Sequence, residues 1–265
     1  MSSETRPMVK QKVAGRPLLL IGRGVTDDTA YFELMCPGCQ YGTLGGIIAD
    51  VLEELNVGGK TVCVGGVGCH SFVALGIQVD MIAAPHGRAP DVATAVKRIR
   101  PNLSVFTIQG DGDCIAIGAG ALIAAMGRGE KITILMCNNA NYGTTGGQLA
   151  PTTIIGQKTP TSPLGRDPER EGYPIHTAEL VATFKGVAYS ARGSLHTAAN
   201  YQRTKKYVKT AFEKQSDNVG LSFVEIISTC PPNWHMTPVD CLDWIDKNVV
   251  PEFPLGEFKN VDSIQ

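Results

Sequence analysis

The sequence contains no apolar run long enough to cross a bilayer, because none approaches the roughly 20 apolar residues of a membrane-spanning helix. It also lacks an excess of charge of one sign: 24 Lys and Arg against 25 Asp and Glu give a formal net charge of −1. Such a balance implies no overall attraction to nucleic acid or to an anionic membrane surface. We therefore expect neither nucleic acid nor a membrane as a partner.

The amino-terminal residues lack the pattern of a secretory signal peptide. Residues 1–11 are polar and of mixed charge, and the apolar run Pro17–Ile21 is too short for a signal core. We therefore expect a cytoplasmic protein. Cysteine, by contrast, is plentiful. Eight cysteines in a cytoplasmic chain of 265 residues favour metal binding or redox chemistry over structural disulfides.

From Cys36 onward the pattern predicts strands that alternate with helices. The expected strands are 60–64, 79–84, 104–109, 131–137 and 222–227, and the expected helices are 47–55, 90–99, 115–126, 177–184, 197–215 and 239–248. This alternation predicts an α/β fold with a mostly parallel sheet covered by helices on both faces. We expect an extension over 1–33, one domain over 34–258 and a tail over 259–265. The long loop 138–163 favours a functional role.

Oxygen-bearing side chains follow two of the expected strands. The run Gly110-Asp111-Gly112-Asp113 ends one strand, and Asn139 follows another, 28 residues after Asp111. Because the carboxyl ends of parallel strands meet at one edge of a sheet, these side chains can converge. Mg²⁺ prefers oxygen ligands and is usually shared with the phosphates of a substrate. The spacing therefore predicts a site for magnesium and a diphosphate.

Glycines and a helix start support this prediction. Gly110 and Gly112 would let phosphates approach the backbone, and a helix beginning near Asp113 would offer free N–H groups and a positive dipole end. Gly143, Gly146 and Gly147 would let the next loop fold closely over a ligand. Turns also favour Gly, Asp and Asn, so a GDG run alone leaves an ordinary turn as the alternative.

The segment resembles thiamine-diphosphate enzymes, whose signature is GDG followed one βαβ crossover later by an Asn pair. Its continuation, NANYGTTGGQ over residues 139–148, resembles the β subunits of 2-oxoacid:ferredoxin oxidoreductases. The resemblance implies that Asp111, the side chain of Asn139 and the backbone carbonyl of Asn141 bind Mg²⁺. It further implies the thiamine-diphosphate contacts Gly110, Asp111, Gly112, Asp113, Asn139, Tyr142, Gly143, Thr145 and Gly146.

Four cysteines lie on expected loops or strand ends, where their sulfurs can face one site. They are Cys36 and Cys39 in CPGC, Cys69 in GVGC, and Cys230 before two prolines. Four thiolates suit tetrahedral zinc or a [4Fe–4S] cluster, and a CxxC pair alone could also form a redox disulfide. In the oxidoreductase β subunits, matching cysteines hold a [4Fe–4S] cluster near the thiamine. The resemblance therefore implies the same cluster here, although Gln40 stands where the family motif continues with glycine.

The other four cysteines are expected to pack as small apolar residues: Cys63, Cys114, Cys137 and Cys241. The loop Pro85–Pro90 is similar to the HGRA loop of the same β subunits, which approaches their active site. His86 and Arg88 are therefore candidates for the substrate side, with a helix entry and a surface arginine as the alternative. Lys158 and Arg166, in the long loop and just after it, are candidates for contacts with CoA phosphates or the substrate.

The resemblance implies a complex that oxidatively decarboxylates a 2-oxoacid to acyl-CoA and CO₂ and passes electrons to ferredoxin. The glutamate that activates thiamine belongs to a pyrimidine-binding domain, for which this chain has no room, and Glu225 is expected to be structural. We therefore expect an α subunit with that domain, and γ or ferredoxin-like subunits. Tail motifs such as Asn233-Trp234 resemble 2-oxoglutarate or branched-chain members. A non-redox thiamine enzyme subunit and a zinc-stabilised binding protein are the alternatives.

Overall fold

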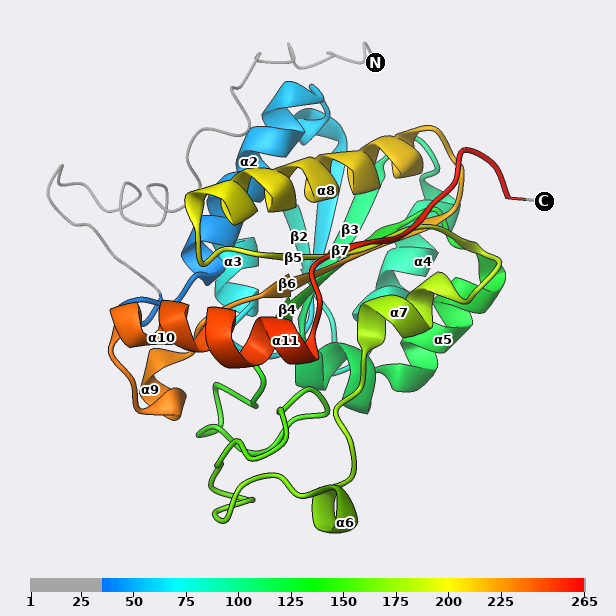
Figure 1. Cartoon of the computed structure of the whole chain (residues 1–265). Helices are drawn as coiled ribbons and strands as arrows, with labels where there is room; N and C mark the ends of the chain where they lie inside the picture. Colours follow the sequence, from blue (N-terminus) through cyan, green and yellow to red (C-terminus); the bar gives the residue numbers. More distant parts are fainter. Residues whose placement is uncertain (1–34, 265) are drawn as a thin grey trace, which may run out of the picture.

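A computed structural model describes residues 35–264, and its centre is a sheet of seven strands in the order β2-β1-β3-β4-β6-β5-β7 (Figure 1). The strands are β1 Thr61–Gly65, β2 Asp80–Ala83, β3 Ser104–Gly110, β4 Thr133–Asn138, β5 Val187–Ser194, β6 Leu221–Ile227 and β7 Gly256–Asn260. All neighbouring strands pair in parallel except β5 and β7, which pair antiparallel. The predicted mostly parallel α/β sheet is confirmed. The expected extension over 1–33 lies outside the described residues.

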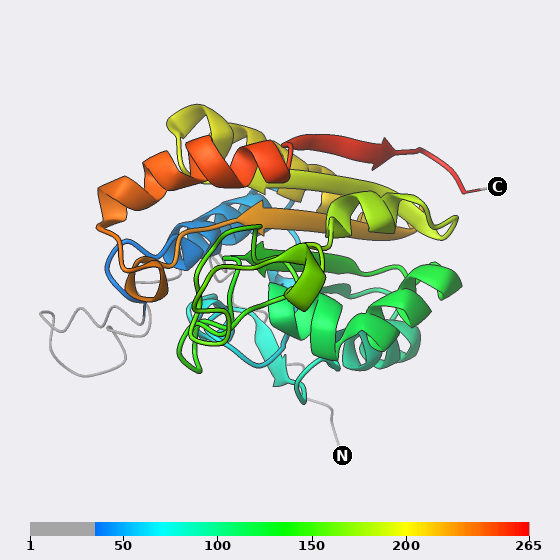
Figure 2. The ribbon, with the colours of Figure 1, turned by 60° about the horizontal axis from the view of Figure 1, so that its bottom comes forward.

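Helices cover both faces of this sheet, as Figure 2 shows for α8 and α5 on opposite sides of β5 and β6. One face carries α2 Tyr41–Glu54, α3 Ser71–Leu75 and α8 Ala198–Ser216; the other carries α4 Ala89–Ile99, α5 Ala119–Arg128 and α7 Thr177–Ala182. The shorter elements are α6 Pro168–Glu171, α9 Pro231–Trp234, α10 Pro238–Trp244, α11 Val250–Glu252, a 3₁₀ turn Gly58–Lys60 and the π-helical segments Gly112–Ile117 and Ile245–Val249. None of the helices in residues 35–264 combines the length and apolar character that crossing a bilayer requires.

The core consists of two apolar layers, one on each side of the sheet. Every residue of β1, β3, β4, β5 and β6 is buried, as expected of parallel strands covered on both faces. On the α8 side, the rings of Phe106 and Phe212 meet edge to face at 5.5 Å between centroids. This packing fixes the strand tips in space, and the tips carry the polar residues considered below.

Several elements differ from the sequence-based expectation. Helix α2 begins at Tyr41, six residues before the helix expected over 47–55, and the helix expected over 239–248 divides into α10 and a π-helical segment. Strand β5 is not predicted because its sequence, VAYSARGS, has no apolar run: its buried Arg192 and serines are stabilised by polar partners. Strand β7 crosses the expected boundary at 258, so the first two residues of the predicted tail belong to the sheet. The helix expected over 115–126 is two segments, a π-helical turn Gly112–Ile117 and then α5, separated by Gly118.

Candidate functional site

A cavity opens where the carboxyl ends of β1, β2, β3 and β4 meet the loop that follows β4. Its empty volume is about 530 Å³, part of it open to solvent. The residues that line it are Tyr41, Val67, Gly68, Cys69, His70, His86, Gly110, Asp111, Gly112, Asp113, Asn139, Asn141, Tyr142, Gly143, Thr144 and Thr145. The cavity thus brings together all the predicted cofactor contacts except Gly146, and it includes His86 but not Arg88.

Asp111 lies at the tip of β3 and is buried. One carboxylate oxygen accepts the backbone N–H of Gly112 at 2.9 Å, and the other accepts the hydroxyl of Thr152 from the long loop. Burial raises the pKa of Asp111 from 3.8 to about 7, although these two hydrogen bonds lower it. A divalent cation beside this carboxylate would offset the cost of burying its charge, so the residue fits the predicted Mg²⁺ ligand.

Asp113 is also buried, but its carboxylate faces protein groups. Its Oδ1 accepts the backbone N–H of Gly87 at 2.8 Å and that of Val67 at 3.3 Å. Its Oδ2 accepts the side-chain amide of Gln109 at 2.7 Å. The carboxylate therefore ties the loops after β1 and β2 to β3, so its structural role is to hold these loops together beneath the cavity.

The same carboxylate also orients His86. The Nδ1–H of His86 donates to Asp113 Oδ1, which leaves Nε2 as the ring nitrogen without a protein partner among the hydrogen bonds of the described chain. Arg88 instead lies at the start of α4, with its side chain 56% exposed and 3.6 Å from Asp91. The geometry thus separates the two candidates for the substrate side and leaves only His86 at the cavity.

The two glycines of GDG make room for side chains. A Cβ on Gly112 would lie 2.1 Å from the ring of Tyr142, and one on Gly110 would lie 3.0 Å from the imidazole of His70. His70 is buried, its Nε2 has no hydrogen bond, and burial lowers its pKa to about 4. Both glycines also line the cavity, and the expectation that they let phosphates approach the backbone stays a prediction.

The loop after β4 is held in a strained shape. Ala140 has φ of +55°, a conformation rare outside glycine, and it persists because its neighbours fix it. Its N–H donates to Asn138 Oδ1 at 3.0 Å, and its carbonyl accepts the hydroxyl of Thr153 at 2.7 Å. Asn139 and Asn141 on either side are buried at the cavity. This backbone conformation thus places Asn139 and Asn141 in the lining of the same cavity as Asp111.

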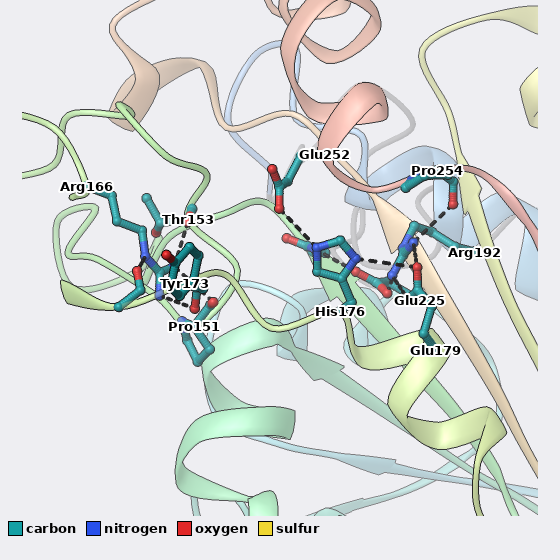
Figure 3. A network of polar contacts seen from close by, with 12 residues as sticks. Pro151, Thr153, Arg166, Tyr173, His176, Glu179, Arg192, Glu225, Glu252 and Pro254 are labelled. Atoms are coloured by element: carbon teal, nitrogen blue, oxygen red, sulfur yellow. Dashed lines mark hydrogen bonds and ion pairs between the residues drawn. The ribbon is translucent and has the colours of Figure 1, made fainter. Parts of the chain in front are cut away.

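Arg166 organises the long loop that follows. It is only 5% exposed, and its guanidinium donates to backbone carbonyls on both sides of the loop, including Thr153 at 2.6 Å and Tyr173 at 2.7 Å (Figure 3). Its hydrogen-bonding groups are therefore engaged by the protein, which removes the basis for a contact with CoA. The same loop supplies Thr152 to Asp111, so Arg166 supports the site indirectly.

The four predicted cluster ligands lie close to one another beside the cavity. Burial raises the pKa of the Cys39 thiol to about 12; the N–H of Tyr41 opposes this rise, whereas the thiols of Cys230, Cys69 and Cys36 add to it. None of the eight cysteines forms a disulfide in residues 35–264. Binding to iron would remove the thiol protons and offset the repulsion between the four sulfurs, so this donor set fits an iron–sulfur cluster. The other four cysteines are buried, which confirms that they pack in the interior.

The thiols and the cavity share a boundary. Gly143 lies between them, since a Cβ there would be 3.3 Å from Cys69 Sγ and 3.2 Å from the amide of Asn139. Cys69 itself lines the cavity. The indole N–H of Trp234, four residues beyond Cys230, donates to the carbonyl of Asn139 at 3.1 Å. The two predicted sites are therefore adjacent parts of one structure.

A buried ion pair lies under the tip of β4. Glu225 accepts the side-chain amide of Asn138 at 2.7 Å and the Nε–H of Arg192 at 2.9 Å, and both Glu225 and Arg192 are fully buried (Figure 3). Arg192 also pairs with Glu179 and lies 5.2 Å from the ring centroid of Phe253. The prediction that Glu225 is structural is confirmed.

Sequence reasoning misses several residues of the site. Tyr41, Val67, Gly68 and Thr144 line the cavity, and Thr152, Asn233 and Trp234 hold its walls. Tyr41 and Gly68 stand near predicted cluster ligands in the sequence, so proximity could have indicated them. The contact of Thr152 with Asp111 spans 41 positions between two loops and leaves no periodic signal.

Known proteins share this arrangement of strands and loops. Residues 66–226 match the family described as "Thiamine pyrophosphate enzyme, C-terminal TPP binding domain". The chain is 36% identical over 225 residues to the ketoisovalerate oxidoreductase subunit VorA of Methanothermobacter thermautotrophicus, covering 85% of this chain and 47% of that protein. It is 34% identical over 218 residues to the 2-oxoglutarate synthase subunit KorB of Archaeoglobus fulgidus, covering 81% and 76% respectively.

A solved structure has the same fold. The 2-oxoglutarate:ferredoxin oxidoreductase from Magnetococcus marinus, with 2-oxoglutarate, coenzyme A and succinyl-CoA bound, superimposes with a TM-score of 0.73 at 24% identity, covering 86% of this chain and 81% of that one. The chain spans about half the length of the VorA proteins, at 47% and 48%, and three quarters of the KorB protein above. On these matches, the chain belongs to the family of 2-oxoacid:ferredoxin oxidoreductase subunits that carry the thiamine-pyrophosphate-binding domain.

Proposed function

We propose that this chain is the β subunit of a CoA-dependent 2-oxoacid:ferredoxin oxidoreductase. It would bind thiamine diphosphate with Mg²⁺ and one [4Fe–4S] cluster, and its complex would convert a 2-oxoacid to acyl-CoA and CO₂ while passing electrons to ferredoxin. The observation that carries the proposal is the adjacency of the two sites, with Gly143 between the Cys69 sulfur and the Asn139 amide. A reaction that removes electrons from a substrate on thiamine needs such a neighbour.

The residues on each wall of the cavity would have a distinct role in this function. Asp111 and the amide of Asn139 would hold Mg²⁺ with the carbonyl of Asn141, and the loop Tyr142–Gly146 would cover the diphosphate. Bound thiamine diphosphate supplies the electron sink that decarboxylation of a 2-oxoacid requires. His86, oriented by Asp113, would present Nε2 to the substrate side and exchange a proton there. The exposed position of Arg88 gives it no part in the cavity.

Part of the cavity is open to solvent, so a partner subunit can complete the site. We propose that an α subunit with the pyrimidine-binding domain completes the site, that γ or ferredoxin-like subunits belong to the same complex, and that ferredoxin accepts the electrons. Glu225 cannot serve as the thiamine-activating glutamate, because it is fully buried and paired with Arg192. The substrate would be of the 2-oxoglutarate or 2-oxoisovalerate type, in line with the names of the KorB and VorA relatives. We also propose a cytoplasmic location and an oxygen-sensitive enzyme.

The zinc-stabilised binding protein receives no support from the described chain. Within residues 35–264, no three His, Cys, Asp or Glu side chains come together closely enough to hold a single metal ion. An iron–sulfur cube spaces its four thiolates more widely than one tetrahedral ion does, so this finding is compatible with the proposed cluster. A non-redox thiamine enzyme would have no use for four such cysteines.

The test is purification of the native complex without oxygen, followed by CoA-dependent viologen reduction with a panel of 2-oxoacids. We expect brown protein that contains thiamine diphosphate and reduces viologen with 2-oxoglutarate or 2-oxoisovalerate. Colourless, active protein that only decarboxylates would identify the non-redox alternative. Zinc without a thiamine requirement would identify the binding protein.

A further inference from the structure

Two of the four cysteine sulfurs are in hydrogen-bond contact with polar side chains that belong to, or hold, the cofactor loop, residues 141–147. The hydroxyl of Thr144 lies 3.0 Å from Cys69 Sγ. The side-chain nitrogen of Asn233 lies 3.3 Å from Cys230 Sγ. Thr144 is part of the loop, whereas Asn233 lies in α9, three residues beyond Cys230. The two contacts therefore come from different segments and converge on one loop.

The orientation of the Asn233 amide is fixed by a third group. Its nitrogen also donates to the carbonyl of Gly143 at 2.9 Å, and a carbonyl oxygen can only accept. The NH₂ end of the amide must therefore face both Gly143 and the Cys230 sulfur. Close packing holds it there: Gly147 has φ of +84°, and a Cβ on it would come within 2.8 Å of the Asn233 Cβ.

The direction of both bonds is determined once iron is bound. A thiolate that binds iron carries no proton, so the hydroxyl of Thr144 must be the donor to Cys69, as the Asn233 amide is to Cys230. One-electron reduction adds one negative charge to a cluster and its thiolates. Donors aimed at the sulfurs stabilise that added charge, and hydrogen bonds to sulfur are among the factors that set the potential of such clusters.

We propose that Thr144 and Asn233 are positioning residues that raise the reduction potential of the cluster from the cofactor loop. This inference rests on the proposed function, because it requires the cluster. It goes further because it assigns a new role to two residues that are not cluster ligands. These residues control how readily the cluster accepts an electron. Because both donors hold the loop against the sulfurs, the loop that covers the cofactor also tunes the electron acceptor beside it.

The experiment is a redox titration of the native complex, purified without oxygen, with dithionite as reductant and the reduced cluster followed by electron paramagnetic resonance. The signal of this chain's cluster is the one that Cys69→Ser removes. Thr144→Val and Asn233→Leu, which remove a donor at nearly constant shape, should each shift its midpoint potential to a more negative value. The double variant should shift it furthest, and Thr144→Ser, which keeps a hydroxyl, should restore the wild-type potential.

Thr183→Val is the matched control, because that hydroxyl donates to the carbonyl of Leu180 at 2.7 Å at the end of α7, and Thr183 is not among the residues that line the cavity. Its midpoint potential should equal that of the wild type. An unmoved potential in Thr144→Val, with full iron content, would overturn the inference even if Asn233→Leu failed to fold. A wild-type complex without any signal that Cys69→Ser removes would overturn the proposed function itself, so the two failures are distinct.

Discussion

Replacing Asp111 by Asn should stabilise the chain in the absence of cation and cofactor while abolishing cofactor binding. The carboxylate is buried, and burial raises its pKa from 3.8 to about 7. Between these values the folded chain holds a proton that the unfolded chain has lost, so stability falls as pH rises from about 4 to about 7. At 1.36 kcal/mol per pH unit, the loss at pH 8 is up to about 4 kcal/mol.

The asparagine avoids this loss and keeps both hydrogen bonds. Its oxygen can still accept the N–H of Gly112, and its NH₂ can donate to Thr152, whose hydroxyl rotates to accept. Asp111→Asn should therefore unfold at higher urea than the wild type at pH 8 and at nearly the same urea at pH 4. Adding Mg²⁺ with thiamine diphosphate should stabilise only the wild type, by about 2.7 kcal/mol at a hundred times the Kd.

Asp113→Asn is the matched control, and it should change the stability of the cofactor-free chain in the opposite direction. Both of its oxygens accept N–H donors, so an amide NH₂ must face a donor and leave it unsatisfied. Such a loss costs about 1–3 kcal/mol, so this variant should be less stable than the wild type without cofactor. The reasoning would be refuted if Asp111→Asn lowered the stability at pH 8 as much as Asp113→Asn does.

Three further outcomes follow from the same contacts. Glu225→Leu leaves Arg192 buried without this partner and should lower the free energy of unfolding by about 3–5 kcal/mol, measured by urea denaturation; an unchanged midpoint would contradict the buried pair. His86→Ala should lower the rate of viologen reduction at least about 100-fold, since proton transfer contributes that much. Arg88→Ala should keep this rate within about threefold of the wild type, because the ion pair of Arg88 is exposed. Equal losses in the two variants would argue against the assignment of His86 to the active cavity. Removing Mg²⁺ with EDTA should release thiamine diphosphate in equilibrium dialysis, and retention of the cofactor would argue against the Asp111 site.

The strand tips of the site could be predicted from sequence because their signals are local. Asp111 and Asn139 each follow an apolar run, and parallel pairing of the strands then brings them to one edge. Cys69 similarly follows β1. The hydrophobic pattern indicates these runs without any knowledge of the rest of the chain.

The supporting contacts could not be predicted in this way. Asn233 meets Gly143 across 90 positions, and both residues lie outside strands and long helices, so neither carries a period. Strand β5 is missed for a related reason. Arg192 looks like a surface residue in the sequence, and its buried position is explained only by its ion pair with the buried carboxylate of Glu225. Partnered polar groups in the interior leave no apolar pattern, and these groups shape the site.

The adjacency of cofactor and cluster is tested most directly by counting iron and thiamine diphosphate in the native complex purified without oxygen. We predict that Cys39→Ser removes about four iron atoms per copy of this chain while thiamine diphosphate remains, and that Asp111→Ala removes thiamine diphosphate while the iron remains. An iron content unchanged by Cys39→Ser, or thiamine diphosphate retained by Asp111→Ala, would contradict the proposed pair of sites.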